Sequence, residues 1–394
     1  MTKIIYLDNG ATTRVDPEVL KAMWPYFTEA YGNAASLHAK GIEAKDALEK
    51  ARKVIAKSIN AESEEIIFTS GGTEANNLAI KGIAFNNKDK GNHIITTNVE
   101  HKCVSESCKW LETQGFTTTY LGVNKEGFVN LDELKKAITP KTILVSIIHG
   151  NNEIGTINDL YSIGQICKKQ DLCFHTDACQ SYTKTELDIK KMNLDLVTIN
   201  AHKIHGPKGV GALFIKKGTK IKQWQHGGAH EFNLRAGTEN IPGVTGFAKA
   251  VELAQNKKHV EYMIKLRDKL ISNILRIPDV ILNGPIGNNR LCNNANFSFK
   301  GIEGEAIGGY LDSYGVCSST GSACSSLKLE PSHVLKAIGR NNEEANGSLR
   351  LTLSRFTTEE EIDFVLEKLP YITDKLRSFS PIYKVINRVL KKSD

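Results

Sequence analysis

The sequence predicts an α/β protein in which a mostly parallel sheet is covered by helices on both faces and is followed by a smaller α+β region. Up to about residue 250, short apolar runs rich in β-branched residues alternate with stretches of helical periodicity. The runs are apolar almost throughout, as expected for strands buried on both faces of a parallel sheet. From about residue 256, a long charged helix, isolated strand-like pieces and a C-terminal helix replace this alternation.

The first region contains several short candidate strands and three clear candidate helices. Strands are expected at residues 66–69, 93–96, 142–148, 173–176, 196–199 and 211–215. Helices are expected at residues 41–59, 74–84 and 159–170. In the first of these helices lysines occupy one face, and the opposite face carries Ala47, Leu48, Ala51, Val54, Ile55 and Ile59.

The second region is expected to begin with a helix at 257–276, followed by strands near 280–282 and 296–299. A Gly/Ser-rich stretch follows at 315–326. The final helix is expected from about residue 359, because Thr358 and Glu361 form the pattern of a capping box.

Composition excludes several classes of protein. The chain has 394 residues, of which 40% are hydrophobic and 24% charged, which is typical of globular proteins. Its net charge of +7 is spread along the chain, so we expect no nucleic-acid partner. None of the eight cysteines forms a Cys-x-x-Cys pair, which argues against a disulfide framework. With no leader segment and no apolar run near the ~18 residues of a membrane helix, we expect a soluble, cytoplasmic protein without a membrane partner.

Three polar features occur where predicted strands end. Lys203 precedes a Gly/Pro-rich loop, which places an amine at the carboxyl edge of the sheet. Asp177 ends a strand, where a carboxylate is costly unless it is paired, for example with a pyridinium nitrogen. At 68–77 a strand passes through Gly72 and Thr73 into a helix, whose first N–H groups form an anion site. Together these features indicate a phosphorylated aldehyde cofactor.

These segments resemble cysteine desulfurases of the NifS/IscS type, which are pyridoxal-phosphate-dependent members of the class-V aminotransferase family. The resemblance covers nearly the whole chain and depends on motifs at 6–13 (YLDNGATT), 31–33 (YGN), 69–74 (TSGGTE), 100–101 (EH), 151–155 (NNEIG), 175–181 (HTDACQS), 202–203 (HK), 235–240 (RAGTEN), 318–325 and 348–350 (SLR). It implies pyridoxal phosphate as cofactor and fold type I of the enzymes that use it. A large cofactor-binding domain with a seven-stranded sheet would span residues 15–255. A small domain would consist of residues 1–14 and 256–394 and carry a mobile loop at about 315–330.

The resemblance assigns roles around the cofactor ring. Lys203 matches the lysine that holds the cofactor as a Schiff base, and Lys208 is the alternative amine. Asp177 matches the partner of the pyridine nitrogen, and Gln180 the partner of the phenolic oxygen. His101 matches the imidazole stacked on the ring, which is also a candidate to take the proton of the substrate thiol.

The phosphate group would be held by one set of residues from each subunit. Thr238 would reach in from the second subunit of a homodimer, and the residues of the first subunit would be Gly72, Thr73, Asn200 and His202. Asn200 departs from the pattern of the family, in which a serine is common at this position.

The resemblance also assigns the substrate and the sulfur carrier. Arg350, with Asn152 beside it, would bind the carboxylate of L-cysteine. Cys324 would take the sulfur as a persulfide, leaving L-alanine, whereas Cys317 is not the matching residue. The length of the loop resembles the branch that delivers sulfur to iron–sulfur scaffold and other acceptor proteins, for iron–sulfur clusters and other thio-cofactors.

Three alternatives remain at this point. A selenocysteine lyase would use the same scaffold and cofactor, and a class-V aminotransferase would need no mobile cysteine. A non-enzymatic metal scaffold would use the cysteines and the 11 histidines. No cluster of these residues has zinc or iron–sulfur spacing, so we expect no metal site.

Overall fold

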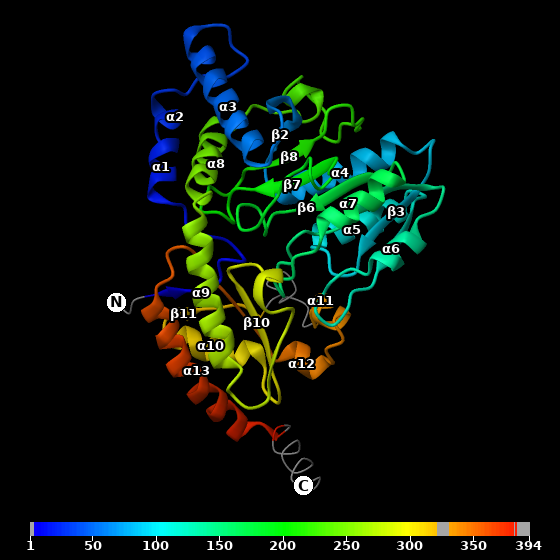
Figure 1. Ribbon diagram of the computed structural model, residues 1–394. Helices are drawn as coiled ribbons and strands as arrows, with labels where there is room; N and C mark the ends of the chain where they lie inside the picture. Colours follow the sequence, from blue (N-terminus) through cyan, green and yellow to red (C-terminus); the bar gives the residue numbers. More distant parts are fainter. Residues whose placement is uncertain (1–3, 321–330, 382, 384–394) are drawn as a thin grey trace.

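A large, mostly parallel sheet forms the upper half of the molecule in Figure 1. The computed structural model describes residues 4–320, 331–381 and 383. Within these residues, the sheet has seven strands in the order β2 (Ile66–Thr69), β8 (Gly211–Ile215), β7 (Leu196–Asn200), β6 (Cys173–Asp177), β5 (Thr142–Ser146), β3 (His93–Thr97) and β4 (Thr117–Leu121). Neighbouring strands are parallel except where β8 lies antiparallel to β2 and β7. The predicted fold class is confirmed.

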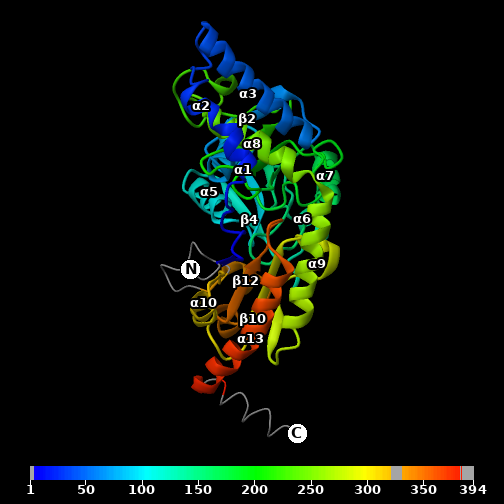
Figure 2. The ribbon, with the colours of Figure 1, turned by 90° about the vertical axis from the view of Figure 1, so that its left-hand side faces the viewer.

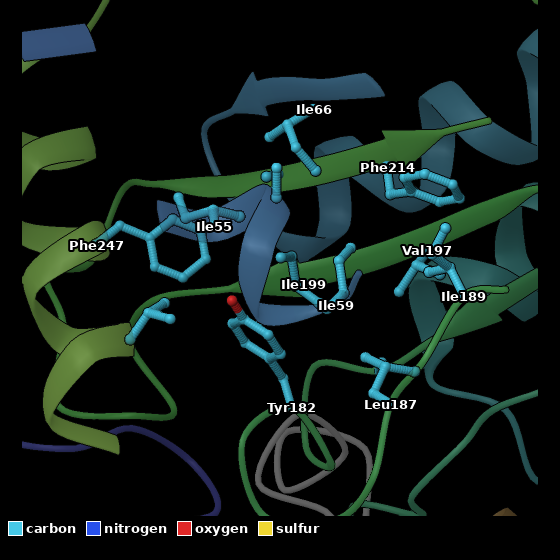
Figure 3. Close-up of a cluster of buried hydrophobic side chains, with 14 of the residues drawn as sticks. Ile55, Ile59, Ile66, Tyr182, Leu187, Ile189, Val197, Ile199, Phe214 and Phe247 are labelled. Atoms are coloured by element: carbon cyan, nitrogen blue, oxygen red, sulfur yellow. The ribbon is translucent and has the colours of Figure 1, made fainter. Parts of the chain in front are cut away.

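Helices cover both faces of this sheet, because strand residues alternate between two apolar layers. One layer packs against α1 (Pro17–Met23), α3 (Ala39–Ser58), α6 (Leu131–Ala137), α7 (Leu160–Lys169) and α8 (Ile241–Ala254). The other layer packs against α4 (Gly72–Asn86) and α5 (Lys102–Glu112). Figure 3 shows part of the first layer, in which Ile55 of α3 and Phe247 of α8 belong to the same apolar cluster as Val197 and Ile199 of β7.

The expected elements are confirmed with small changes at their ends. In the large sheet one strand, β4, was missed, and in the second region the strand at Ser348–Thr352 was missed. β4, with the sequence TTTYL, forms the edge of the sheet beside β3 and leaves much of its surface exposed. A search for continuous apolar runs does not detect such a strand, because only a buried strand needs apolar residues at every position.

The second region has its own sheet and core. β12 (Ser348–Thr352), β10 (Asn294–Phe299) and β9 (Val280–Leu282) form an antiparallel sheet. Its apolar side chains pack with those of α9 (Lys257–Ile274), α10 (Gly304–Ser313) and α13 (Glu359–Phe379), which lie together in the lower half of Figure 2. The predicted capping box of α13 is confirmed: Glu361 N–H donates to Thr358 Oγ1 at 3.3 Å, and Thr358 N–H donates to Glu361 Oε2 at 3.1 Å.

The N-terminal segment that the structure describes, from residue 4 onward, begins in this second region. β1 (Ile5–Tyr6) pairs in parallel with β11 (Val316–Cys317), and Leu7 is buried in the same core. Residues 10–13 then lead to the loop after β7, where Thr13 N–H donates to the carbonyl of His202 at 3.0 Å. The N-terminal segment therefore connects the second region with the carboxyl edge of the large sheet.

A small apolar cluster joins the two regions beside that edge. Val99 and Ile154, which follow β3 and β5, pack against α11 (His333–Ala337) and α12 (Asn342–Asn346). In the part of the chain that the structure describes, no helix is both long and apolar enough to cross a membrane.

Candidate active site

A cavity of about 350 Å³ lies between the two regions at the carboxyl edge of the large sheet. All predicted site residues except Cys324 and Thr238 line it: Gly72, Thr73, His101, Asn152, Asp177, Gln180, Asn200, His202, Lys203 and Arg350. Cys324 lies outside the described residues. Thr238 is exposed and does not line the cavity of its own chain.

Lys203 is the amine of this cavity. It lies just after β7, and its Nζ donates hydrogen bonds to the carbonyls of Ala11, at 2.6 Å, and Gly10. Burial, together with the positive charge of Arg350, lowers the pKa of Lys203 to about 8. An amine with this pKa is neutral in a substantial fraction of molecules near pH 7.5, as a nucleophile requires. The alternative, Lys208, is exposed and does not line the cavity.

Asp177 is a buried carboxylate at the end of β6. Its Oδ1 accepts a hydrogen bond from the backbone N–H of Cys179 at 2.9 Å, and its Oδ2 accepts one from Asn76 Nδ2 at 2.7 Å. Asn76 is fully buried on α4 and was not predicted as a site residue. The signal that could have identified it is an amide on an otherwise apolar helix face next to the glycine turn.

The amino end of α4 forms an anion site. Gly71, with φ of 154°, turns the chain from β2 into the helix, so that the N–H groups of Gly72 and Thr73 begin the first turn. A Cβ on Gly72 would lie 2.5 Å from Cys179 Sγ, so the close packing here requires glycine.

Two polar side chains face the same end of the cavity. Asn200 is buried at the end of β7, and its Oδ1 has no hydrogen-bond partner within the described residues. A bound polar group would supply the missing partner of this oxygen, or of the amide nitrogen if the side chain of Asn200 is flipped. His202 contacts Thr12 Oγ1 through Nδ1 at 3.1 Å, and burial lowers its pKa to about 4, so the ring is a neutral hydrogen-bonding group.

Arg350 lies on β12 at the opposite end of the cavity. Its Nη1 donates to the carbonyl of Asn152 at 2.9 Å, and its Nη2 donates to Asp8 Oδ1 at 3.0 Å. These contacts fix the guanidinium plane in a buried position, from which it can bind a carboxylate. The Oδ1 of Asn152 is buried without a partner within the described residues. Asp8 was not predicted, because its pairing joins residues 342 positions apart.

Residues near α11 complete the wall and were also missed by sequence analysis. His333 Nε2 contacts the carbonyl of Glu100 at 2.9 Å, and Ser332 Oγ donates to Glu153 Oε2. The carboxyl groups of Glu100 and Glu153 are both buried. Burial raises the pKa of Glu153, and it raises the pKa of Glu100 to about 8. These contacts hold the chain after residue 330 against the cavity.

The donor set fits pyridoxal phosphate. The half-buried amine of lowered pKa matches the aldehyde of that molecule, and the buried carboxylate matches its pyridine nitrogen. The helix N-terminus, with hydroxyl and amide groups beside it, matches its phosphate. In the part of the chain that is described, no group of three or more His, Cys, Asp or Glu residues could hold a metal ion.

Comparison with known proteins places the chain in a family. Residues 5–365 match the model of the aminotransferase class-V family. The cysteine desulfurase IscS of Dictyoglomus turgidum is 52% identical over 396 residues, covering 100% of both chains. The cysteine desulfurase IscS of Clostridium botulinum is 51% identical over 388 residues, covering 98% of each chain. A solved NifS-like protein matches with a TM-score of 0.90 and 39% identity, covering 95% of this chain and 100% of its own. The chain therefore belongs to the class-V aminotransferase family and, within it, to the cysteine desulfurases.

Proposed function

We propose that this protein removes sulfur from L-cysteine, giving L-alanine, and that the sulfur is transferred to Cys324 as a persulfide. The observation that carries the proposal is a cavity, built by described residues, in which a half-buried lysine of lowered pKa and a buried carboxylate lie together with a buried arginine. Its relatives support it: besides the desulfurases named above, a solved structure described as SspA in complex with cysteine matches with a TM-score of 0.81 and 34% identity.

Pyridoxal phosphate is the cofactor of this enzyme. Lys203 would hold its aldehyde, Asp177 would keep its ring nitrogen protonated, and Gln180 would contact its phenolic oxygen. Gly72, Thr73, Asn200 and His202 would hold its phosphate, together with Thr238 of a second subunit. When bound, the cofactor supplies an electron sink that stabilises negative charge at the α-carbon of the substrate.

Arg350 would orient the substrate. Its guanidinium is held by Asp8 and by the carbonyl of Asn152, so a substrate carboxylate meets a group that is already positioned. Lys203, once displaced from the cofactor, would move the proton of the α-carbon, because its pKa of about 8 allows it both to accept and to return a proton near neutral pH. His101, which lines the same cavity, would contact the reacting atoms.

The sulfur transfer balances without a further reagent. The Cys324 thiolate attacks the sulfur of the substrate and forms an S–S bond, while the C–S bond breaks. The electron pair of the broken C–S bond remains with carbon and, after protonation, becomes a C–H bond of alanine. The product at Cys324 is a persulfide, which an acceptor thiol can collect.

We also propose the setting of this reaction. The exposed position of Thr238 supports a homodimer in which it would reach the cofactor of the partner. The IscS names of the relatives support delivery of sulfur to an iron–sulfur scaffold or another acceptor protein. We propose that this delivery takes place in the cytoplasm.

The visible spectrum of the purified protein tests the assignment. The absorbance of a lysine-bound cofactor should be present and should change when L-cysteine is added. Lys203→Ala should abolish that band, and the matched variant Lys208→Ala should keep it, because Lys208 is exposed outside the cavity. A protein without the band, or a Lys203→Ala variant with an unchanged spectrum, would contradict the proposal. Alanine formation from selenocysteine but not from cysteine would favour the selenocysteine lyase instead.

A further inference from the structure

A continuous chain of hydrogen bonds connects Asp177 with His101 on the wall of the cavity. Asn76 Nδ2 lies 2.7 Å from Asp177 Oδ2 and 3.1 Å from Cys103 Sγ. Cys103 Sγ in turn lies 2.9 Å from His101 Nδ1. Asn76 is in the second turn of α4 and Cys103 in the first turn of α5, so the packing of these two helices in one apolar layer brings the groups together.

The direction of each hydrogen bond can be assigned. A carboxylate only accepts, so the amide of Asn76 must point its nitrogen at Asp177; the flipped amide would place an oxygen against an oxygen. The two hydrogens of that nitrogen then serve Asp177 and Cys103, and the sulfur is an acceptor from Asn76. Burial, with the negative charge of Asp177, raises the pKa of the Cys103 thiol, so its hydrogen is retained and is directed at His101 Nδ1.

A second donor converges on the same nitrogen. His101 is the N-cap of α5, and its Nδ1 accepts a hydrogen bond from the backbone N–H of Cys103 at 3.2 Å. A ring nitrogen that accepts two hydrogen bonds carries no proton itself. Burial lowers the pKa of His101, which favours the neutral ring over the imidazolium, and the single proton of the neutral ring must then be on Nε2.

We propose that Asn76 and Cys103 are positioning residues that hold His101 as the neutral tautomer protonated at Nε2. His101 then presents a hydrogen-bond donor to the reacting atoms, and Nε2 cannot act as a base in this state. For catalysis the inference depends on the proposed function, and there it revises the expectation that His101 takes the proton of the substrate thiol. The tautomer itself depends only on the contacts of α4 and α5.

Nitrogen-15 NMR of the holoenzyme labelled at histidine tests the tautomer, with the His101 signals identified by their loss in His101→Gln. We expect the Nδ1 of His101 at the shift of an unprotonated, pyridine-type nitrogen and Nε2 at the shift of a protonated, pyrrole-type nitrogen. In Cys103→Ala the Nδ1 signal should move, because one of its two donors is gone, and in Cys103→Ser it should stay close to its original shift. Cys108→Ala is the matched control, since it removes a buried thiol from the same helix without touching His101.

Kinetics supply the second readout. Loss of one neutral hydrogen bond should lower the kcat of Cys103→Ala about 2- to 10-fold with little change in KM, and Cys103→Ser should restore it. A protonated Nδ1 in the unmodified enzyme, or a Cys103→Ala spectrum identical with that of the parent, would overturn the inference. If the tautomer is as expected but no alanine is formed from L-cysteine, the proposed function fails and the inference about His101 stands.

Discussion

The two ends of the cavity are built in different ways. The cofactor end, defined by Gly72, Thr73, Asp177 and Lys203, belongs to strands and helices of the large sheet. The substrate end, defined by Asp8, Asn152 and Arg350, is assembled from the N-terminal segment, the loop after β5 and the small sheet. The cofactor end therefore depends mainly on the large sheet, whereas the substrate end exists only when the two regions are in contact. Substitutions at the two ends should separate cofactor chemistry from substrate binding.

The largest effect is expected at the cofactor end, from Asp177→Asn. Removing one preorganised electrostatic partner typically costs about 100- to 1000-fold in kcat, and we expect a loss of that size, with a shifted cofactor spectrum. Steady-state alanine production and the visible spectrum check it. The control is Asp132→Asn, which changes an exposed aspartate of α6. Near-normal turnover in Asp177→Asn would mean that the carboxylate does not support the cofactor.

A smaller loss is expected at the substrate end, from Arg350→Lys. An ammonium cannot form the paired hydrogen bonds of a guanidinium with a carboxylate. The loss of one charged hydrogen bond corresponds to a decrease in kcat/KM of about 10- to 100-fold, mainly through KM. The cofactor spectrum without substrate should be unchanged, and a loss of cofactor absorbance would show that the two ends are not separable.

Asp8→Asn should have a weaker effect at the same end. Asp8 is half-buried and holds Arg350 through one contact at 3.0 Å. A partly exposed ion pair contributes up to about 1 kcal/mol, so KM for L-cysteine should rise up to about 5-fold. A change confined to kcat would contradict the role of Asp8 in positioning the arginine.

The last effect concerns Lys203 and appears as a pH dependence of the stability of the apoprotein rather than as a loss of activity. In the apoprotein, burial lowers the pKa of Lys203 to about 8, from the ordinary lysine value of 10.5. The folded state therefore binds its proton less tightly than the unfolded state, and the charged amine destabilises the fold below pH 8. As the pH rises from 8 towards 10.5, this destabilisation should disappear.

Lys203→Met should isolate this contribution. In the apoprotein, Lys203→Met should raise the free energy of unfolding, measured with urea, by more at pH 7 than at pH 10. Lys208→Met, on an exposed side chain, should show no such difference. A difference between Lys203→Met and the parent that is independent of pH would contradict the lowered pKa.

The contrast between the two ends also explains what sequence analysis could predict. Asp177 ends a buried strand, and Lys203 and the Gly72–Thr73 turn each follow one, so a local pattern indicates both the strand and the position of the polar group at its carboxyl end. The assignment of Arg350 as the substrate-binding residue depended on the resemblance to the family, because no local sequence pattern distinguishes it from an arginine in a structural ion pair.

The contacts that were missed depend on pairings between distant segments. Asp8 meets Arg350 only because β1 lies beside the small sheet, and Asn76 meets Cys103 only because α4 and α5 pack side by side. β4 was missed for a different reason: it is an edge strand whose polar residues face solvent.

The central claim is that this cavity takes sulfur from L-cysteine and passes it to one particular thiol. A single-turnover reaction of the holoenzyme with sulfur-35-labelled L-cysteine, without reductant, tests it directly when alanine and protein-bound label are both counted. We predict one alanine and one labelled sulfur per chain, with the label on the peptide that contains Cys324 and absent in Cys324→Ser but not in Cys317→Ser. Alanine formation with the label on another cysteine, or undiminished protein labelling in Cys324→Ser, would contradict the claim.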